Sequence, residues 1–172
     1  MAETARLREQ LILFVPRVQG EPLEALRHAL DPVQARLIAA HVTLCREDEI
    51  ADLDRVRLFE RLRGVGPLRL EFGPAERFQG HGILLPCVAG EADFQAMRRE
   101  VLGSAARGHA PHLTLAHPRN PRAAGNLLLD SPGLPRHIAI TFLAVSMIRQ
   151  YGGQPWQQLG RTTLGPAVVS AD

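Results

Sequence analysis

Apolar and polar positions along the chain follow two periods, and the shorter period marks the candidate strands. The apolar run 11–15 stops at Pro16, as a buried strand does, and 68–72 alternates apolar and charged residues like a strand with one exposed face. The sequence predicts strands over 11–17, 41–45, 68–72, 83–89, 112–116, 137–148 and 156–164. The turn-like Y-G-G-Q-P at 151–155 favours a hairpin between the last two.

Apolar residues at helical spacing mark the candidate helices. Pro22 is expected to open the first of them, because proline suits the first turn of a helix. Helices are predicted over 23–29, 33–39, 47–63 and 91–102. The segment 47–63 has acidic residues first and arginines last, which complements the dipole of a helix. Because strands and helices mix without a regular strand–helix–strand alternation, the predicted class is α+β.

The chain has 172 residues, of which 45% are hydrophobic and 22% charged, and this composition supports one self-sufficient core. We therefore expect a single domain over 1–172, with 166–172 as a flexible tail. The apolar run 11–15 is too short for an export signal, and no stretch approaches the ~18 apolar residues of a membrane span. The prediction is a cytoplasmic monomer without membrane attachment.

The charge pattern excludes several chemistries, because all 20 basic residues are arginine and lysine is absent. Phosphate loops of the Walker type, Schiff-base enzymes and ligases with a lysyl-nucleotide intermediate all need a lysine. We therefore expect no ATP and no other cofactor. The net charge of +2 also argues against a broad electrostatic grip on duplex nucleic acid. A phosphate-bearing ligand is expected to be held by a few local groups.

A short motif occurs twice: H-V-T-L begins at His41, and H-L-T-L begins at His112. Residues i and i+2 of a strand share one face, so His41 stands beside Thr43, and His112 beside Thr114. With an ordinary pKa near ~6.5, one imidazole can accept a proton while the other donates one. Two such histidines beside one phosphorus suffice for acid–base phosphoester chemistry without a metal ion, and the threonine hydroxyls can donate to the phosphate oxygens.

One such motif is explained equally well by a half-buried histidine next to a good strand former, but two copies in equivalent settings are not. On these motifs the sequence resembles the two-histidine phosphoesterase superfamily, in particular its bacterial RNA 2',3'-cyclic phosphodiesterase and 2'-5' RNA ligase branch. The opening L-I-L-F-V-P-R resembles the family's first strand, P-H-L-T-L-A its second motif, and I-R-Q-Y-G-G-Q-P-W-Q-Q-L its closing hairpin. The resemblance spans most of the chain.

This resemblance implies a bilobal α+β fold with pseudo-two-fold symmetry, in which antiparallel sheets flanked by helices enclose an open cleft between the lobes. It implies that His41 and His112 carry catalysis and that Thr43 and Thr114 bind phosphate. The chain departs from the family in two places that bear on substrate choice. It has C-R-E-D at 45–48 where many members have a Phe-Leu-Gly-like stretch, and His117 where many have an arginine.

Four further residues are candidate substrate ligands. Arg46, Arg119 and Arg149 are candidate phosphate clamps, because a guanidinium binds phosphate through two donors. Tyr151, next to two glycines, is a candidate for contact with a base, whereas Phe14 and Trp156 are expected to pack in the core.

Two competing chemistries have weaker support. The histidines at 109, 112 and 117 suggest a metal site, but their spacing puts neighbours on opposite strand faces and no acidic ligand lies among them, so no metal site is predicted. Cys45 shares the parity of His41 and could be a nucleophile, although a buried apolar thiol explains it better.

The predicted function is metal-independent hydrolysis of a 2',3'-cyclic phosphate of RNA or of a small nucleotide, reversible as 2'-5' RNA ligation. The expected partners are RNA ends or small cyclic nucleotides. The alternative is a non-catalytic module that binds RNA ends or nucleotides on the same fold.

Overall fold

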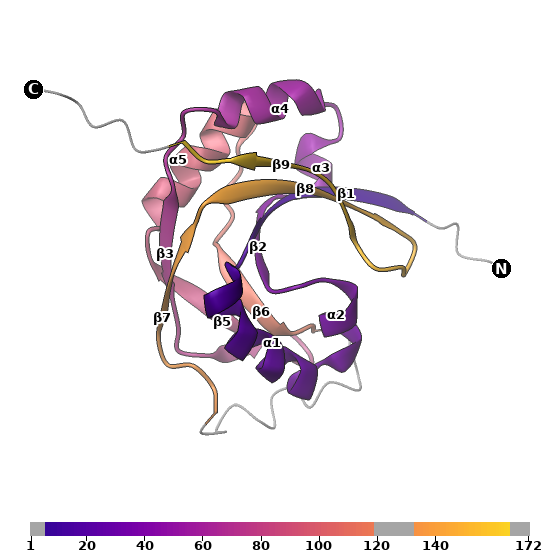
Figure 1. Cartoon of the computed structure of the whole chain (residues 1–172), viewed down its shortest axis with the longest axis vertical. Helices are drawn as coiled ribbons and strands as arrows, with labels where there is room; N and C mark the ends of the chain where they lie inside the picture. The colour runs from indigo at the N-terminus through magenta and orange to yellow at the C-terminus, as the bar shows by residue number, and fades with distance from the viewer. Residues whose placement is uncertain (1–5, 119–132, 166–172) are drawn as a thin grey trace, which may run out of the picture.

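Two antiparallel sheets form the frame of the protein (Figure 1). The structure is a computed structural model that describes residues 6–118 and 133–165, so the tail expected at 166–172 lies outside the described residues. The strands are β1 (Leu7–Phe14), β2 (His41–Cys45), β3 (Leu68–Phe72), β4 (Glu76–Phe78), β5 (Gly82–Ala89), β6 (His112–Ala116), β7 (Ile138–Phe142), β8 (Ala144–Tyr151) and β9 (Gln157–Thr163). The helices are α1 (Arg17–Leu30), α2 (Pro32–Leu37), α3 (Glu47–Ile50), α4 (Arg55–Leu62) and α5 (Glu91–Leu102).

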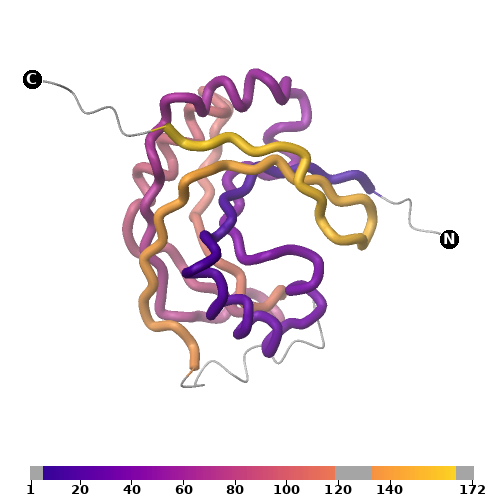
Figure 2. The backbone as a smooth tube through the Cα atoms, viewed as in Figure 1, coloured from indigo at the N-terminus to yellow at the C-terminus, as the bar shows by residue number. Residues whose placement is uncertain are grey.

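Each sheet has one motif strand beside a long central strand. The first sheet has the order β2-β1-β8-β9, and the second has the order β4-β5-β3-β7 with β6 paired to β5. The tube in Figure 2 shows how the last two strands lie along the first one, and residue pairing confirms that β8 joins β1 to β9. The predicted closing hairpin is therefore present, and it completes the sheet that carries the first motif.

The chain builds one unit twice, a strand followed by helix and then by an antiparallel motif strand. In the first unit β1 pairs with β2, and Phe14 lies opposite His41. In the second unit β5 pairs with β6, and Pro86 lies opposite His112. Because strand, helix and strand occur in the same order, both histidines sit at the start of a strand that follows a helical connection.

The helix α5 illustrates why the connections form where they do. Gly90 precedes the helix with a φ of 92°, and a Cβ there would lie 2.3 Å from the carbonyl oxygen of Arg69. Only glycine fits such a position without strain. Glu91 and Asp93 occupy the first turn and Arg99 the last, in the order that the helix dipole favours.

Side chains from both sheets and from the helices share one core. The apolar residues of the two motif strands point into it, together with aromatic residues from other elements. Its large buried members include Leu11, Leu13, Leu44, Leu58, Phe72, Phe94, Leu113, Ile140, Phe142 and Met147. Each such burial stabilises the fold by about 1.5–3 kcal/mol relative to exposure. The α+β class, with two antiparallel sheets flanked by helices, is confirmed.

Several local predictions differ from the structure, among them the strand predicted over 11–17, which is β1 and ends at Phe14. Helix α1 begins at Arg17, so Pro22 lies inside the helix. Proline has no N–H and cannot bond the carbonyl of Val18 one turn earlier, but Val18 is 87% exposed and open to water. The helix expected over 47–63 is two helices, because the Asp54 carboxylate accepts from the backbone N–H of Val56 (2.8 Å) and starts α4 afresh.

The strand expected over 137–148 is also divided. Strand β7 pairs with β3 in the second sheet, and β8 pairs with β1 in the first, so the chain changes sheets at Leu143. Leu143 is 52% exposed, and its carbonyl accepts from the backbone N–H of Leu164 (2.9 Å). A run of apolar residues gives no sign of such a crossing, because both strands are buried.

No helix within residues 6–118 and 133–165 is long and apolar enough to cross a membrane.

Candidate active site

The two motif strands lie beside each other although they belong to different sheets (Figure 1). Their five residues alternate identically: the histidine and the threonine are half-buried, while the residues between and after them are buried. The period of two in a strand therefore puts His41 with Thr43, and His112 with Thr114, on the face turned away from the core. The structure brings together all four residues of the two motifs.

Both histidines are held in the same way. The Nδ1 atom of His41 lies 2.8 Å from the carbonyl oxygen of Ala39, and that of His112 lies 3.0 Å from the carbonyl oxygen of Ala110. A carbonyl only accepts, so Nδ1 must carry the proton in each neutral ring. The Nε2 atom of each ring is then the nitrogen available for proton transfer.

Each histidine also has an aromatic neighbour. Phe14 packs edge-on to His41 with ring centroids 6.5 Å apart, and Phe78 lies tilted against His112 at 5.3 Å. Phe14 therefore supports a site histidine from β1 and is not one of the fully buried core residues. Such contacts restrict the rotation of the imidazole rings and so keep Nε2 in one direction.

One cavity of about 620 Å³ contains both motifs. Its lining comes from β1, α1, α2, the two motif strands, β4 and the β8–β9 turn. The lining residues are Arg8, Gln10, Arg27, Val33, Gln34, Leu37, Ile38, His41, Thr43, Phe78, His112, Thr114, Leu115, His117, Gln150, Gly152, Gly153 and Trp156. This volume lies within the range of small-molecule sites.

The surroundings of His41 favour its neutral form. Desolvation is the largest effect and lowers the pKa of His41 to about 4, and the positive charges of Arg27 and of His112 act in the same direction. The hydrogen bond to Ala39 opposes them. At neutral pH, His41 is therefore uncharged, with Nε2 able to accept a proton.

The arginines at the cavity are not those that the sequence suggested. Arg46 lies 3.6 Å from Asp48, Arg149 is bound to Glu9 (2.7 Å), and neither lines the cavity. Arg119 lies outside the described residues. Arg8 and Arg27 line the cavity instead.

Both arginines are held by carboxylates, and Arg8 donates to Glu47 (2.7 Å). Arg27 is 4% exposed, donates to the carbonyl of Ile38 (2.8 Å) and to Glu24 (2.8 Å), and thereby holds the segment that leads into β2. Glu24 in turn accepts from the backbone N–H of Ala40. Arg27 occupies a position on the buried face of α1, between Leu23 and Leu30. An arginine where the helical spacing calls for an apolar residue was the sequence signal for a buried structural arginine.

Two aromatic positions also differ from expectation. Tyr151 is 59% exposed and does not line the cavity, whereas Trp156 does, with the Arg8 guanidinium 5.2 Å from its ring centroid. The backbone N–H of Trp156 bonds the carbonyl of Leu37 (2.9 Å), which attaches the β8–β9 turn to α2. Trp156 therefore belongs to the cavity wall and was not found from the sequence, because its location depends on that turn.

The other chemistries considered have little geometric support. Cys45 is buried, and burial raises the pKa of its thiol to about 12, so it stays protonated and outside the cavity. Within residues 6–118 and 133–165, no three side chains of His, Cys, Asp or Glu are grouped to hold a metal ion.

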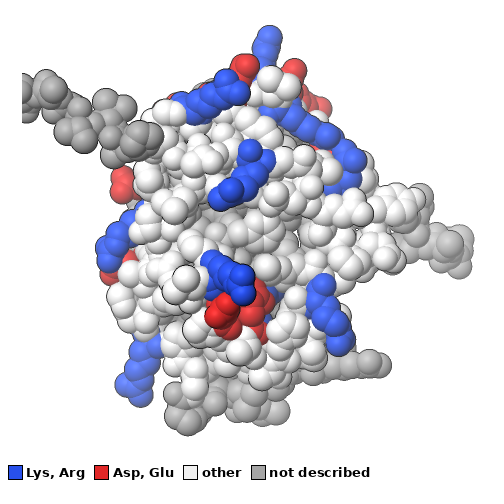
Figure 3. Space-filling view, in the orientation of Figure 1, with Lys and Arg blue, Asp and Glu red and all other residues white. Residues whose placement is uncertain are grey.

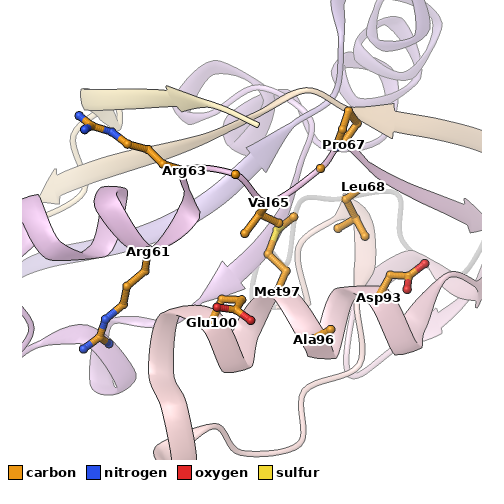
Figure 4. A pocket seen from close by; sticks show the side chains of 11 residues that line it. Arg61, Arg63, Val65, Pro67, Leu68, Asp93, Ala96, Met97 and Glu100 are labelled. Carbon is orange, nitrogen blue, oxygen red and sulfur yellow. The ribbon is translucent and has the colours of Figure 1, made fainter. Parts of the chain in front are cut away.

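A second cavity of about 510 Å³ lies between α4, the following loop and α5 (Figure 4). Arg61, Asp93 and Glu100 supply charge there, but no histidine or cysteine lines it. On the face shown in Figure 3, basic side chains are spread apart, several beside acidic ones, as the small net charge leads one to expect. The first cavity, which holds both motif histidines, is therefore the candidate active site.

The fold is similar to that of E. coli LigT. The structure of LigT complexed with phosphate has a TM-score of 0.57 and 17% sequence identity, covering 94% of this chain and 99% of that chain. LigT complexed with ATP gives 0.54 and 16%, and LigT complexed with 3'-AMP gives 0.55 and 15%, with the same coverage. No curated protein matches the sequence.

The fold of the chain is thus of the LigT type. Residues 14–150 match the family model of the 2'-5' RNA ligase superfamily. The chain belongs to this superfamily, and the family resemblance recognised from the two motifs is confirmed.

Proposed function

We propose that this protein hydrolyses a 2',3'-cyclic phosphate, at the end of an RNA or on a small nucleotide, by acid–base catalysis with His41 and His112. The observation that carries the proposal is that both H-x-T motifs line one cavity, with both Nδ1 atoms bound to carbonyls. Membership of the 2'-5' RNA ligase superfamily supports this choice of substrate class.

In the proposed reaction, His41 accepts a proton from water through Nε2 as the water oxygen bonds to phosphorus. The bond between phosphorus and one ribose oxygen breaks, and His112 gives that oxygen a proton, which leaves a phosphate monoester. We assign the base to His41 because its environment favours the neutral ring. The imidazoles regain their starting protonation by exchange with water.

Thr43 and Thr114 are proposed to donate hydrogen bonds to the non-bridging phosphate oxygens, since each stands two residues after its histidine on the same strand face. Arg8 and Arg27 add positive charge at the cavity wall. Arg119 stays a candidate phosphate ligand on sequence grounds. Arg46, Arg149 and Tyr151 do not line the cavity, and the proposed reaction assigns them no direct part.

Ligation would be the same ring opening with the 5'-hydroxyl of an RNA in place of water: His41 accepts the hydroxyl proton as the 5' oxygen bonds to phosphorus, and the bond to one ribose oxygen breaks as His112 gives that oxygen a proton. The cyclic phosphate already holds the energy of the new bond, so the step needs no ATP. Hydrolysis and ligation are thus one ring-opening step at one site with two different attacking hydroxyls.

The test is turnover of adenosine 2',3'-cyclic phosphate and of a short RNA ending in a cyclic phosphate, followed by phosphorus NMR with and without EDTA. We expect a single monoester product and an unchanged rate in EDTA. The double variant His41→Ala/His112→Ala is the control. Binding of the RNA end without any turnover by the wild-type protein would replace the proposal with the non-catalytic binding module.

A further inference from the structure

A third histidine joins the two motif strands. His109 lies in the segment before β6, and its Nε2 is 3.1 Å from the backbone carbonyl oxygen of Thr43, in the first motif. Its ring centroid is also 6.0 Å from that of His112, in the second motif. One side chain therefore touches the strand of one catalytic histidine and the ring of the other.

The direction of this hydrogen bond is fixed by chemistry. A backbone carbonyl cannot donate, so Nε2 of His109 carries the proton, opposite to the Nδ1–H form required at His41 and His112. Burial lowers the pKa of His109, and the positive charge of Arg98 lowers it further. The neutral ring with its proton on Nε2 is the form that the contact needs.

Helix α5 holds His109 in this position. The Gln95 side-chain amide donates to the backbone carbonyl of His109 (2.7 Å), and the Phe94 ring packs against the imidazole with centroids 6.1 Å apart. Both residues lie on the helix one turn before the buried Arg98. Helix α5 therefore holds both the backbone and the imidazole ring of His109.

Arg98 makes a second connection of this kind, to the residue that follows Thr43 in β2. It is fully buried, and its guanidinium donates to the carbonyl of Leu44, next to Thr43 in β2, and to the carbonyl of Arg107 (2.8 Å), ahead of β6. Glu49 balances its charge at 2.6 Å. Two successive carbonyls of β2 are therefore bound by groups of the second half.

These connections matter for the proposed reaction, because two histidines that act on one phosphorus must be held at a fixed separation. Strand β2 pairs with β1, and β6 pairs with β5; within the described ranges no strand pairing joins β2 to β6. The separation of the catalytic rings is then set by side-chain contacts between the two sheets. A displacement of ~1 Å in such a site can cost on the order of 10²-fold in rate.

We propose that His109 is a positioning residue, which sets His41 and His112 at their working separation through the hydrogen bond from its Nε2–H to the Thr43 carbonyl. This inference rests on the function proposed above. His109 itself exchanges no proton with substrate, and its contribution depends on a donor located where Nε2 now lies.

The test uses three variants of His109 assayed on adenosine 2',3'-cyclic phosphate. The amide nitrogen of glutamine reaches the place of Nε2, whereas that of asparagine is one methylene too short. We expect His109→Leu and His109→Asn to lower kcat by about 10- to 100-fold with KM changed less than about threefold. His109→Gln should recover kcat to within about threefold of wild type.

His137→Leu is the matched control, because it removes a histidine Nε2 contact, 2.9 Å from Glu71, far from either motif in the sequence. It should leave kcat and KM unchanged. If His109→Gln is no better than His109→Asn, the donor is irrelevant and the inference is wrong. The same holds if folded His109→Leu keeps the wild-type kcat; should that variant not fold, the Gln and Asn pair decides.

Imidazole nitrogen NMR of the wild-type protein at neutral pH tests the contact without any substrate. We expect His109 with its proton on Nε2, and His41 with its proton on Nδ1. An Nδ1–H form of His109 would overturn the proposed contact even in an active enzyme. Absence of turnover with the expected form at His109 would instead reject the proposed function.

Discussion

The two motif-bearing halves, 7–50 and 82–116, place their motif strands in the same way and differ in what else their buried arginines bind. In both, a helix places a buried arginine against a carbonyl of the segment leading into the motif strand: Arg27 bonds Ile38, and Arg98 bonds Arg107. In both, a residue one turn earlier on that helix helps: Glu24 accepts from Ala40. Gln95 plays the corresponding part for His109.

The difference lies in where each arginine finds its other partners. Arg27 pairs with Glu24 on its own helix and lines the cavity. Arg98 pairs with Glu49 and with the Leu44 carbonyl, both from the first half, and lies away from the cavity. The first arginine therefore serves its own half and the site, while the second attaches one half to the other. The repeated features position the two motifs, and the unequal ones join the two halves.

The largest expected effect tests whether the histidines of both halves contribute to catalysis. His41→Ala and His112→Ala should each lower kcat/KM by about 10²- to 10⁴-fold, the usual contribution of a group that transfers a proton. The double variant should lose much less than the product of the two, because one proton carrier has little to contribute without the other. Steady-state kinetics on a cyclic nucleotide, with folding checked by circular dichroism, measures this. A folded single variant with near-wild-type activity would show that its half is not catalytic.

The next prediction concerns the different partners of the two buried arginines. Arg98→Met should lower the free energy of unfolding by about 3–5 kcal/mol, because it leaves the Glu49 carboxylate, 2% exposed, without its partner. Arg27→Met should cost less, since Glu24 is 28% exposed and stays solvated. Urea unfolding of both variants provides the comparison. Equal losses would mean that Arg98 does not hold the halves together more strongly than Arg27 holds its own segment.

The pH dependence of stability tests the environment of His41, the motif histidine of the first half. The pKa of His41 is lowered from 6.5 to about 4, so between these values the unfolded chain binds a proton that the folded protein refuses. Stability is therefore complete above pH 6.5 and declines as the pH falls toward 4, by on the order of 3 kcal/mol from this group.

The variant His41→Asn keeps a donor near Nδ1 but does not titrate. Its free energy of unfolding should therefore fall less than that of the wild type between pH 6.5 and 4, as urea unfolding at each pH will show. Parallel curves for the two proteins would refute the lowered pKa. Proton NMR titration of the imidazoles in the same pH range compares His41 with His112 directly.

The smallest expected effect concerns the threonines. Thr43→Val and Thr114→Val should each lower kcat/KM by an amount equivalent to about 1–3 kcal/mol, the value of a hydrogen bond to a charged group. Valine keeps the strand shape, so the loss reports the hydroxyl alone. Similar losses would support equal phosphate contacts from the two halves. A loss in only one would place the phosphate nearer that motif.

Much of the fold could be read from local pattern. The bounds of β2, β3, α5 and β6 are those predicted, because each is bounded by Gly, Pro or a change of period that acts within a few residues. The division of the strand over 137–148 was missed because it depends on distant partners, whereas the helix over 47–63 is divided by a local cap at Asp54. Leu143 breaks the strand over 137–148 where the chain must enter the other sheet, and β4 is a three-residue strand with two charged residues that gives almost no periodic signal.

The sequence by itself determined the two motifs and the face that each presents, because the alternation of a strand is a property of the backbone. It thus predicted that His41 stands with Thr43, and His112 with Thr114. Only the tertiary structure decided which other residues share their cavity. Arg8 and Trp156 meet there across almost the whole length of the chain, because β1 pairs with β8 and the β8–β9 turn is attached to α2. Such neighbours are set by sheet order, which no local pattern encodes.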